Sequence, residues 1–597
     1  MKKTFLLSCL MLAAMPVMAA YTGHVYVDKN KNGVFDQSEK PLAGIKVSDG
    51  LNVVETAADG SFTLPGHERE RFIFITTPSG YKTFNRHYHK IEKKQSGYDF
   101  GLIPYSGRIR KNGSHRYIHI ADTEIFNTEN HADWVNNVRD YARNEQAAFI
   151  IHTGDICYEK GLKAHIKLMN TENMDCPVFY CIGNHDLVKG KYGEELFESI
   201  YGPVYYSFDA GNVHYVVTPM PGGDHAPGYT SDDVCRWLKN DLAHIRPGTP
   251  VVVFNHDLLT YEDTFIFKSK NAGSINLNEY NLKAWVYGHW HINYMKKQGD
   301  VYSVCTSSLD KGGIDHSTTA FRVMHVDSKG DFTSELRYTY LDKNICIASP
   351  AGVMASGVLP VAVNVYSSVS PVREVLYTCL ADGKPVLKNK RLLQSTDWSW
   401  NGELPLSHKY VGKELTLRVT ARFNNGEIAE AESHFICRTE KAVPLFSADW
   451  DNLSGNAKHS APVSAPLNLP LQLAWTNNVG ANLYMTSPLI HKGKVIVASV
   501  DEDLKGVGHV YALNGKDGTI LWSCPVRNSI KNSIAVDSDI VFAQDAQGFL
   551  YAIDTETGKL CWEKQLPVNG LPALIDGLVA GEGVVYAGTG KGLCAFE

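Results

Sequence analysis

The stretch VFYCIGNHD at residues 178–186 decides how the middle of this chain is interpreted, because an apolar run there ends in the polar tetrad Gly-Asn-His-Asp. Four further apolar runs between 115 and 292 end in the same manner, and they read YIHIADTE, AFIIHTGD, VVVFNHD and AWVYGHWH. Short apolar runs bounded by turn residues are typical of buried strands. Amphipathic stretches separate them, so residues 115–325 are predicted to form an α/β domain.

Side chains that can bind a metal ion follow each of the five runs. Singly, each motif has an ordinary explanation, since a Gly-Asp pair is usually a turn and an Asn-His pair is often a cap. In an open α/β sheet, however, ligands bind at the carboxyl ends of the strands, so we expect the five ends to meet at one edge. The candidate residues are Asp122, Glu124, Asp155, Asn184, His185, His256, His289 and His291.

In their order along residues 115–292, the five motifs resemble those of the calcineurin-like metallophosphoesterases. The resemblance implies a four-layer α/β core and a centre of two divalent metal ions. It implies that one ion is held by Asp122, Glu124, Asp155 and His291, and the other by Asp155, Asn184, His256 and His289. Asp155 would bridge the two. His185 is expected over the phosphate, where it would protonate the leaving oxygen of a phosphomonoester or phosphodiester.

The implied chemistry accounts for these residue types. Two divalent cations roughly 3.5–4 Å apart can clamp a phosphoryl oxygen and generate hydroxide for in-line attack. A single carboxylate can give one oxygen to each ion and so fix their spacing. Neutral histidine and asparagine ligands limit the negative charge that a phosphate ester would meet.

Two positions depart from the family pattern. Glu124 stands where the family usually has histidine, and a carboxylate favours manganese or magnesium over zinc or iron. Manganese and a neutral to alkaline pH optimum are therefore expected, unless Glu124 points away and the first metal position is weak or empty. Tyr158 stands where many relatives have an aspartate that orients the catalytic histidine, which leaves Tyr158, Glu159 and Asp186 as candidates to support His185.

Other polar residues of the domain have weaker signals. His119 and His152 read as histidines within strands, and neither is expected to be a metal ligand. Asp224 or His225 in a Gly- and Pro-rich loop could touch substrate, although a solvated loop is the more ordinary interpretation. Lys311 offers one cation near the end of the domain.

Residues 21–105 read as short strands separated by turns and are predicted to form a β-sandwich module. Within them, DKNKNGVFDQSE places Asp28, Asn30, Asn32, Asp36 and Glu39 at calcium-loop positions, with Gly33 at the sharp turn. The flanks are strands, so the loop resembles the calcium loops of B-type surface repeats in exported bacterial proteins. The alternative is a polar turn that needs no ion.

Residues 330–440 return to strand patterning and are predicted to form a second β module. Both flanking modules resemble the companions of an exported bacterial branch of the phosphoesterases. Further on, VYALNGKDGTILW at 510–522 matches LYAIDTETGKLCW forty residues later, and a period near forty indicates propeller blades. Residues 446–597 resemble pyrroloquinoline-quinone-type repeats, in which a tryptophan packs between neighbouring blades. About three blades do not close a ring, so association or a longer chain would complete it.

The amino end has two lysines before an apolar run at 5–18 and small residues at Ala19 and Ala20, which predicts a signal peptide at 1–20. An exported, periplasmic or extracellular chain is therefore expected, with a lipid anchor at Cys9 as the alternative. No later segment reads as transmembrane. The 597 residues carry 58 basic and 64 acidic side chains. The resulting net charge of −6 gives no specific signal of a nucleic-acid-binding surface.

The sequence predicts an exported, metal-dependent phosphoesterase of multidomain α/β and all-β architecture. The flanking modules favour a substrate that is part of a polymer or a surface. The alternative is a catalytically weak or inactive phosphoesterase scaffold that binds a glycan or a protein, and Glu124 and Tyr158 are the residues that favour it.

Overall fold

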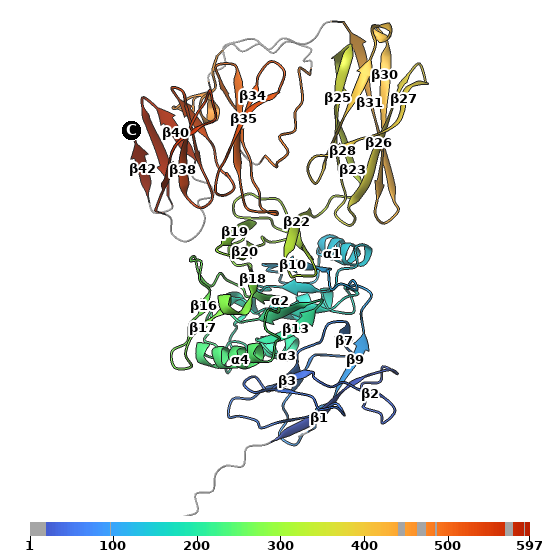
Figure 1. Ribbon diagram of the computed structural model, residues 1–597, viewed down its shortest axis with the longest axis vertical. Helices are drawn as coiled ribbons and strands as arrows, with labels where there is room; N and C mark the ends of the chain where they lie inside the picture. The colour runs from blue at the N-terminus through green and yellow to red at the C-terminus, as the bar shows by residue number, and fades with distance from the viewer. Residues whose placement is uncertain are drawn as a thin grey trace, which may run out of the picture.

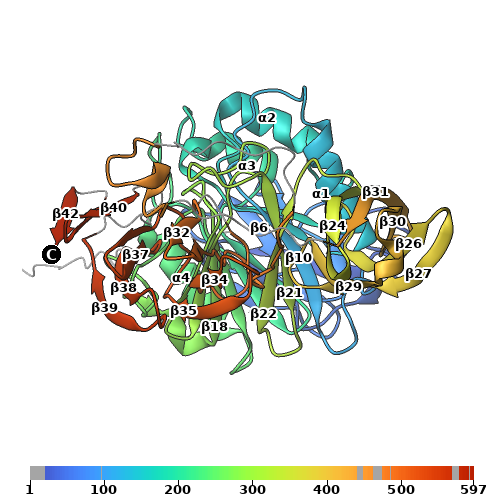
Figure 2. The ribbon, with the colours of Figure 1, turned by 90° about the horizontal axis from the view of Figure 1, so that it is seen from above.

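The structure, a computed structural model, describes residues 20–95, 97–439, 448–461, 473–483, 486–567, 577–589 and 592–597. Apart from Ala20, the predicted signal peptide lies outside the described residues. Figure 1 shows the α/β domain in the middle, the amino-terminal module at one end, and two carboxy-terminal groups of strands at the other. Seen from above in Figure 2, β27 and β42 lie at opposite sides of the molecule. None of the described helices is long and apolar enough to cross a membrane.

The amino-terminal module consists of two packed sheets, which share a core that includes Val25, Phe62 and Ile73. One sheet contains β1 (Tyr21–Val27), β2 (Lys40–Pro41), β5 (Ser61–Leu64), β7 (Tyr81–Thr83) and β9 (Phe100–Pro104). The other contains β3 (Lys46–Ser48), β4 (Val53–Glu55), β6 (Phe72–Ile75) and β8 (Tyr88–Lys90). A bridge between Thr77 and Phe208 joins this module to the central domain.

The central domain contains two sheets rather than the single sheet edge expected from the sequence. The first has the order β12 (Val178–Tyr180), β11 (Ile150–His152), β10 (His115–Ile120), β21 (Ala320–Val326) and β22 (Phe332–Tyr338). The second has the order β13 (Tyr206–Ala210), β14 (Val213–Val217), β15 (Val251–Phe254), β18 (Leu282–Tyr287), β20 (Val301–Cys305) and β19 (Tyr294–Gln298). A small hairpin of β16 (Ile266–Phe267) and β17 (Ile275–Asn276) lies beside them.

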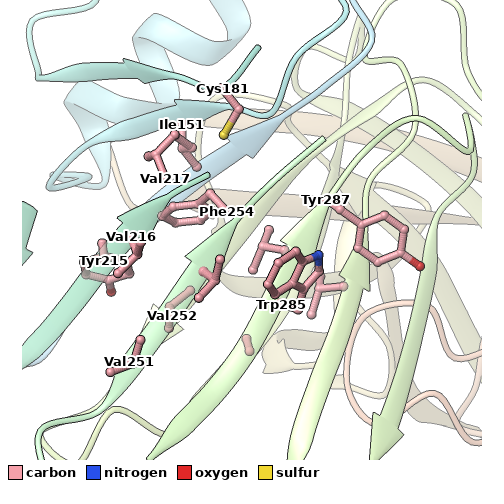
Figure 3. Packing of buried hydrophobic residues seen from close by; sticks show 14 of the residues in the cluster. Ile151, Cys181, Tyr215, Val216, Val217, Val251, Val252, Phe254, Trp285 and Tyr287 are labelled. Atoms are coloured by element: carbon pink, nitrogen blue, oxygen red, sulfur yellow. The ribbon is translucent and has the colours of Figure 1, made fainter. Parts of the chain in front are cut away.

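The two central sheets pack face to face through large apolar side chains. Tyr117 of β10 makes edge contacts with Tyr215 and Phe254 of the second sheet, with ring centroids 5.6 and 5.7 Å away. Figure 3 shows Ile151, Val217 and Phe254 side by side in this core. Because side chains alternate along a strand, Ile118 and Ile120 face the other way and pack on helix α1 (Ala132–Asn144).

Helices complete the layers of the central domain. Helix α1 covers the outer face of the first sheet, and Trp237 of α4 (Ser231–Ala243) belongs to the same buried cluster as the second sheet. Helices α2 (Tyr158–Leu168) and α3 (Glu195–Tyr201) pack on each other. The order helix, sheet, sheet, helix confirms the predicted four-layer α/β core.

Two further sheets form a sandwich with a shared apolar core that includes Val363, Leu417 and Phe435. One contains β23 (Asn344–Ser349), β25 (Gly357–Tyr366), β28 (Leu393–Gln394) and β29 (Ser399–Leu406). The other contains β24 (Gly352–Ala355), β26 (Val372–Ala381), β27 (Lys384–Arg391), β30 (Glu414–Phe423) and β31 (Ile428–Arg438). No helix other than a short 3-10 turn occurs among residues 330–439.

The carboxy-terminal repeats form antiparallel sheets that follow one another like blades. The first sheet is β32 (Leu489–His491), β33 (Lys494–Ala498), β34 (His509–Asn514) and β35 (Ile520–Pro525). The second is β36 (Ala535–Asp537), β37 (Ile540–Gln544), β38 (Phe549–Asp554) and β39 (Leu560–Gln565). The third is β40 (Leu578–Gly581), β41 (Val584–Gly588) and β42 (Leu593–Phe596).

Two tryptophans of the repeat pack on the glycine turn of the next blade. Trp522 donates to Thr555 O at 3.0 Å, and a Cβ on Gly558 would lie 2.6 Å from its ring. Trp475 makes the same contact with Gly518, donating to Gly515 O at 2.8 Å. The repeat pattern therefore begins one tryptophan earlier than the sequence comparison of 510–522 with 550–562 indicated.

Candidate metal centre

The five polar strand ends converge from both central sheets. Strands β10, β11 and β12 run parallel in the first sheet, and β14, β15 and β18 run parallel in the second. Backbone hydrogen bonds link neighbouring ends, from Asp122 N to Gly154 O at 3.1 Å and from Gly288 N to His256 O at 3.0 Å. The sheets pack so that these carboxyl ends meet, and one cluster of side chains results.

The backbone at this cluster is strained. Five of the residues have positive φ angles, which non-glycine residues adopt only at a cost: Asp122 (51°), Glu124 (43°), Asp155 (56°), His289 (63°) and His291 (51°). Such strain persists where the surroundings enforce it, and it gathers at functional sites. Gly183 shows how tight the packing is, because a Cβ there would lie 2.2 Å from Asp155 Oδ1.

One group of ligand atoms forms around the side expected for the first ion. Atoms of Asp122, Asp155 and His291 all lie within 4.8 Å of one another. His291 Nε2 is 3.7 Å from Asp122 Oδ1 and 3.6 Å from Glu124 Oε1. Glu124 therefore faces the cluster, and its Oε2 accepts a hydrogen bond from Lys311 Nζ at 3.0 Å. Lys311 thus contacts the unusual carboxylate of the site.

A second group of ligand atoms consists of Asp155, His256 and His289, again within 4.8 Å of one another. Asp155 belongs to both groups, as the bridging position requires. His256 Nδ1 lies 2.7 Å from the carbonyl oxygen of Thr153, so it carries the proton, and Nε2 presents its lone pair to the cluster. His256 Nε2 lies 3.1 Å from Asp155 Oδ2.

Two buried ligand atoms of the cluster have no hydrogen-bond partner, namely Asn184 Oδ1 and His256 Nε2. Buried polar atoms normally have partners, because leaving one unsatisfied costs about 1–3 kcal/mol. A nitrogen lone pair beside a carboxylate oxygen is also repulsive unless a proton or a cation lies between them. Oxygen and imidazole donors suit manganese, iron and zinc, so the residues present fit divalent metal ions.

The charges of the cluster also indicate that it binds cations. Burial raises the pKa of Asp122 well above its usual value, and the nearby Asp155 carboxylate raises it further. Burial lowers the pKa values of His289 and of His291, and the charge of His256 lowers them further, which favours the neutral rings that can bind a metal ion. Burial also opposes protonation of His256, but Asp155 outweighs it and raises that pKa to about 10. Bound cations would replace this proton as the partner of the carboxylates.

His185 lies at the edge of the cluster and is half-buried. Its backbone N–H donates to Asp155 Oδ1 at 3.0 Å, and its Nδ1 lies 2.8 Å from Asp224 Oδ2. A carboxylate on Nδ1 fixes the ring and leaves Nε2 directed to another group. Burial lowers the pKa of His185, but the hydrogen bond to Asp224 and the charge of Asp155 outweigh it, and the net pKa is raised.

Asp224 is the residue that sequence reasoning missed as the partner of His185. It lies in a loop 39 residues further along the chain, and its N–H donates to Asn184 O at 3.1 Å. The preceding glycine was the available signal, because a Cβ on Gly223 would lie 2.3 Å from Asn184 O. Only a glycine allows this loop to approach the Asn-His pair so closely.

The three residues predicted to support His185 lie in different places. Asp186 accepts hydrogen bonds from the N–H groups of Asp155, Cys157 and Gly183 at 2.8–2.9 Å. It therefore links the loop that follows β11 to the loop that follows β12. Burial, with the charge of Asp155, raises its pKa to about 6. Tyr158 packs its ring 5.4 Å from that of His185. Glu159 instead pairs with Lys163 at 3.9 Å on the exposed side of α2 and does not reach His185.

The two strand histidines are engaged in hydrogen bonds, as expected for residues that are not ligands. His152 bonds Thr123 Oγ1 at 3.0 Å. His119 lies between Thr153 Oγ1 and Thr306 Oγ1, each 2.8 Å away. Arg322 donates to the same Thr306 hydroxyl and also to Glu502 O of the first blade at 2.9 Å. A buried polar network thus runs from the blade to the residue that holds His256.

The amino-terminal loop gathers all five predicted calcium-loop residues. Asp28 accepts from the N–H groups of Asn32 and Gly33, and Glu39 accepts from those of Lys29 and Asp36, at 2.9–3.2 Å. Asn30 and Asn32 direct their side-chain amides at Asp36 Oδ2. Gly33 has the positive φ of 71° that the sharp turn requires. Calcium at this loop stays a prediction.

Comparison with known proteins assigns families to three parts of the chain. Residues 115–293 match the family model described as calcineurin-like phosphoesterase, and residues 29–104 match the one described as its N-terminal domain. The central domain thus resembles calcineurin-like phosphoesterase domains. Residues 472–597 match the family model described as outer membrane protein assembly factor BamB, a model of pyrroloquinoline-quinone-type repeats. The predicted resemblances of the central domain to the calcineurin-like phosphoesterases and of the carboxy-terminal residues to pyrroloquinoline-quinone-type repeats are confirmed.

Individual relatives are distant. Purple acid phosphatase 13 of Arabidopsis thaliana is 26% identical over 215 residues, which is 34% of this chain and 36% of that protein. The chain therefore spans about a third of the length of that relative. A predicted phosphoesterase from Streptococcus pneumoniae is 12% identical, with 38% of this chain and 98% of that chain covered and a TM-score of 0.19. BamB from Moraxella catarrhalis is 13% identical, with coverages of 48% and 80% and a TM-score of 0.16.

Proposed function

We propose that the chain is a metal-dependent hydrolase of phosphoric monoesters or diesters. The observation that carries the proposal is the convergence of unpartnered buried ligand atoms, Asn184 Oδ1 and His256 Nε2, beside the His185–Asp224 pair. The match of residues 115–293 to the phosphoesterase family supports the reaction class.

Asp122, Glu124, Asp155 and His291 would hold one divalent ion, and Asp155, Asn184, His256 and His289 would hold the other. Such ions, when bound, supply charge stabilisation at the phosphoryl oxygens and activate the attacking water. We propose manganese as the native metal, because Glu124 adds an oxygen donor where the family usually has an imidazole. Zinc, iron and magnesium are the alternatives.

A side chain of the protein donates the proton that the leaving group needs. With Nδ1 held by Asp224, His185 presents Nε2 as the donor, and the bonded carboxylate raises the pKa of the ring and so favours its protonated form. As the P–O bond breaks, the leaving oxygen takes this proton and departs as a neutral hydroxyl group. Asp186 keeps the loops of Asp155 and Gly183 in register, so that His185 stays aligned with the phosphorus.

The test is hydrolysis of p-nitrophenyl phosphate and bis-p-nitrophenyl phosphate by the chain from Tyr21 onward, stripped of metal and reloaded with manganese, zinc, iron or magnesium. We expect turnover only with a divalent ion, with manganese best. A Glu159→Gln variant is the matched control, since this carboxylate neighbours Tyr158 but points away from the site. Full metal loading without turnover of either ester would support the alternative, an inactive scaffold that binds a glycan or a protein.

We also propose that the chain is exported, on the basis of the charged, apolar and small-residue pattern at 1–20. Expression of the full chain followed by amino-terminal sequencing of the extracytoplasmic fraction should give a mature end near Tyr21. Recovery of an uncleaved chain from the cytoplasm would contradict this.

A further inference from the structure

Two exposed aromatic side chains, Tyr158 beside His185 and Phe126 beside Tyr158, take no part in the proton transfer described above. Tyr158 and Phe126 are 43% and 56% exposed, although both are large and apolar. Their ring centroids are 6.2 Å apart with an interplanar angle of 18°, and Tyr158 is in turn 5.4 Å from the His185 ring. The three rings form a continuous row that leads away from the proton donor.

The backbone holds Tyr158 in this exposed place. Cys157 and Tyr158 have φ angles of 76° and 56°, two consecutive non-glycine residues in the left-handed region. The hydrogen bond from Cys157 N to Asp186 Oδ1 at 2.8 Å fixes the turn. Backbone strain of this kind costs on the order of 1–3 kcal/mol for each residue, and it is retained where a side chain must occupy a particular position.

The spacing of the two rings indicates how a ligand would use them. A ring inserted between Tyr158 and Phe126 would need roughly 7 Å, twice the contact distance of about 3.5 Å between carbon atoms. The observed 6.2 Å is too short, so a ligand can stack only on the exposed faces. The exposed face of an aromatic ring is flat and polarisable, which favours a planar aromatic ring over an aliphatic group.

We infer that Tyr158 and Phe126 form a subsite for an aromatic ring in the leaving group of the substrate. The inference rests on the proposed function, because the leaving oxygen is the one that receives the proton of His185. In hydrolysis the P–O bond to the leaving group breaks, water supplies the new oxygen on phosphorus, and the departing alcohol lies beside His185. A ring carried by that alcohol would lie over Tyr158, and a ring further from the phosphate, such as a nucleobase beyond a ribose, would reach Phe126.

A second aromatic pair provides a matched control. Tyr261, 54% exposed, stacks on Trp290 with centroids 6.0 Å apart and the same interplanar angle of 18°. Trp290 stands between His289 and His291 in the sequence, so this pair also adjoins the ligand cluster, but among the described residues neither of its rings makes a ring contact with His185. The inference therefore predicts effects for Phe126→Ala and Tyr158→Ala, and no effect for Tyr261→Ala.

The first arm of the experiment measures binding without turnover. Calorimetry on the manganese-loaded chain compares 2-phenylethylphosphonate with 2-cyclohexylethylphosphonate, which cannot be hydrolysed and differ only in the planarity of the ring. The wild type should bind the phenyl compound about tenfold more tightly, a difference of about 1.4 kcal/mol, and stacking on an aromatic side chain is worth this much. Tyr158→Ala should equalise the two, whereas Tyr261→Ala should keep the preference.

The second arm compares hydrolysis of adenosine 5′-monophosphate with that of ribose 5-phosphate, which share the same reacting alcohol. If the substrate carries a nucleoside, the KM for adenosine 5′-monophosphate should be about tenfold lower than the KM for ribose 5-phosphate. The two KM values should become similar in Phe126→Ala. A preference confined to the phenyl compound would assign the subsite to simple aryl esters.

The outcomes separate the inference from the proposed function. Equal binding of the two phosphonates by the wild type, or no binding of either, would overturn the subsite whatever the activity on esters. A phenyl preference that Tyr158→Ala abolishes, in a chain that hydrolyses no ester, would support the ring subsite and contradict the proposed reaction. Loss of the preference in Tyr261→Ala rather than in Tyr158→Ala and Phe126→Ala would place the ligand ring on the Tyr261–Trp290 pair and overturn the assignment.

Discussion

Among the described residues, two regions bring carboxylate and histidine atoms close enough together for a metal ion, and only one of them has the properties of a metal centre. In the phosphoesterase domain these atoms lie around Asp155, and on the first blade Asp449, Asp451 and His491 also bring ligand atoms within 4.8 Å of one another. In the blade cluster the two ring nitrogens of His491 lie 2.9 Å from Asp451 and 3.3 Å from Asp539, so each already has a partner. In the phosphoesterase domain, the buried Asn184 Oδ1 has no hydrogen-bond partner, and His256 Nε2 faces the buried Asp155 carboxylate 3.1 Å away.

The difference teaches that closeness of acidic groups does not by itself indicate a metal ion. The blade cluster satisfies its own histidine, and Asp449 is exposed to water. The central cluster buries Asp122, Asp155 and His256, and without a cation a proton on His256, 3.1 Å from Asp155, must balance these carboxylates. Burying charged groups is costly unless they are paired or coordinate a metal. The following predictions test this contrast, from the largest expected effect to the smallest.

Asp155→Asn should have the largest effect, because Asp155 belongs to both groups of ligand atoms. Loss of a residue that only supports a ligand costs 10- to 100-fold in metal affinity, so loss of the shared ligand should cost more than about 100-fold. Elemental analysis after dialysis should find metal in the wild type and little in this variant. The matched control, Asp451→Asn in the blade cluster, should keep the full metal content, and a loss there would break the comparison.

His185→Ala should lower turnover by about 10²- to 10⁴-fold, the range typical of a lost general acid. Metal content should stay near that of the wild type, since His185 lies at the edge of the ligand cluster. Steady-state kinetics together with elemental analysis on the same preparation checks both. A decrease in turnover below tenfold would argue against a proton-donor role.

Asp224→Asn should lower turnover by roughly tenfold and change the pH profile. The His185 pKa is raised in the folded protein with Asp224 in place, so the protonated acid persists to higher pH and activity is lost as pH rises through that pKa. Removing the carboxylate should lower the pKa, and the alkaline limb should then move to lower pH. An unchanged alkaline limb would mean that Asp224 does not act through His185.

Much of the site was predictable from the sequence, because strand ends and metal-binding residue types leave local signals. The motifs at 122, 155, 184–186, 256 and 289–291 placed eight residues, and the structure brings all of them together. The partner of His185 was not predictable, because Asp224 lies in a loop whose only signal is the small size of Gly223. Nor could the motifs assign each strand to one of the two sheets, since a run such as VVVF at 251–254 reads the same in either sheet.

The role of Tyr158 shows a further limit. From the sequence it appears as the loss of an expected aspartate, which favoured an inactive scaffold. In the structure Asp224 supplies the carboxylate that bonds His185, and Tyr158 is an exposed ring beside it. A substitution at one position of a motif can be compensated from a distant segment, which only the fold brings near.

Glu124→His should give the smallest effect, a change of metal preference rather than a loss of activity. Glu124 Oε1 lies 3.6 Å from His291 Nε2, and replacing the carboxylate by an imidazole makes the donor set softer. Manganese-supported activity should fall severalfold while zinc- or iron-supported activity rises, and the pH optimum should move down. A Lys311→Met variant removes the partner of Glu124 and serves as the comparison. Identical metal preference in wild type and Glu124→His would make Glu124 a bystander.

The most direct test of the central claim is anomalous diffraction from crystals of the chain grown with manganese. The account predicts two peaks in the phosphoesterase domain, one among Asp122, Glu124, Asp155 and His291 and one among Asp155, Asn184, His256 and His289, with no peak at Asp449, Asp451 and His491. A peak at the blade cluster and none around Asp155 would contradict it.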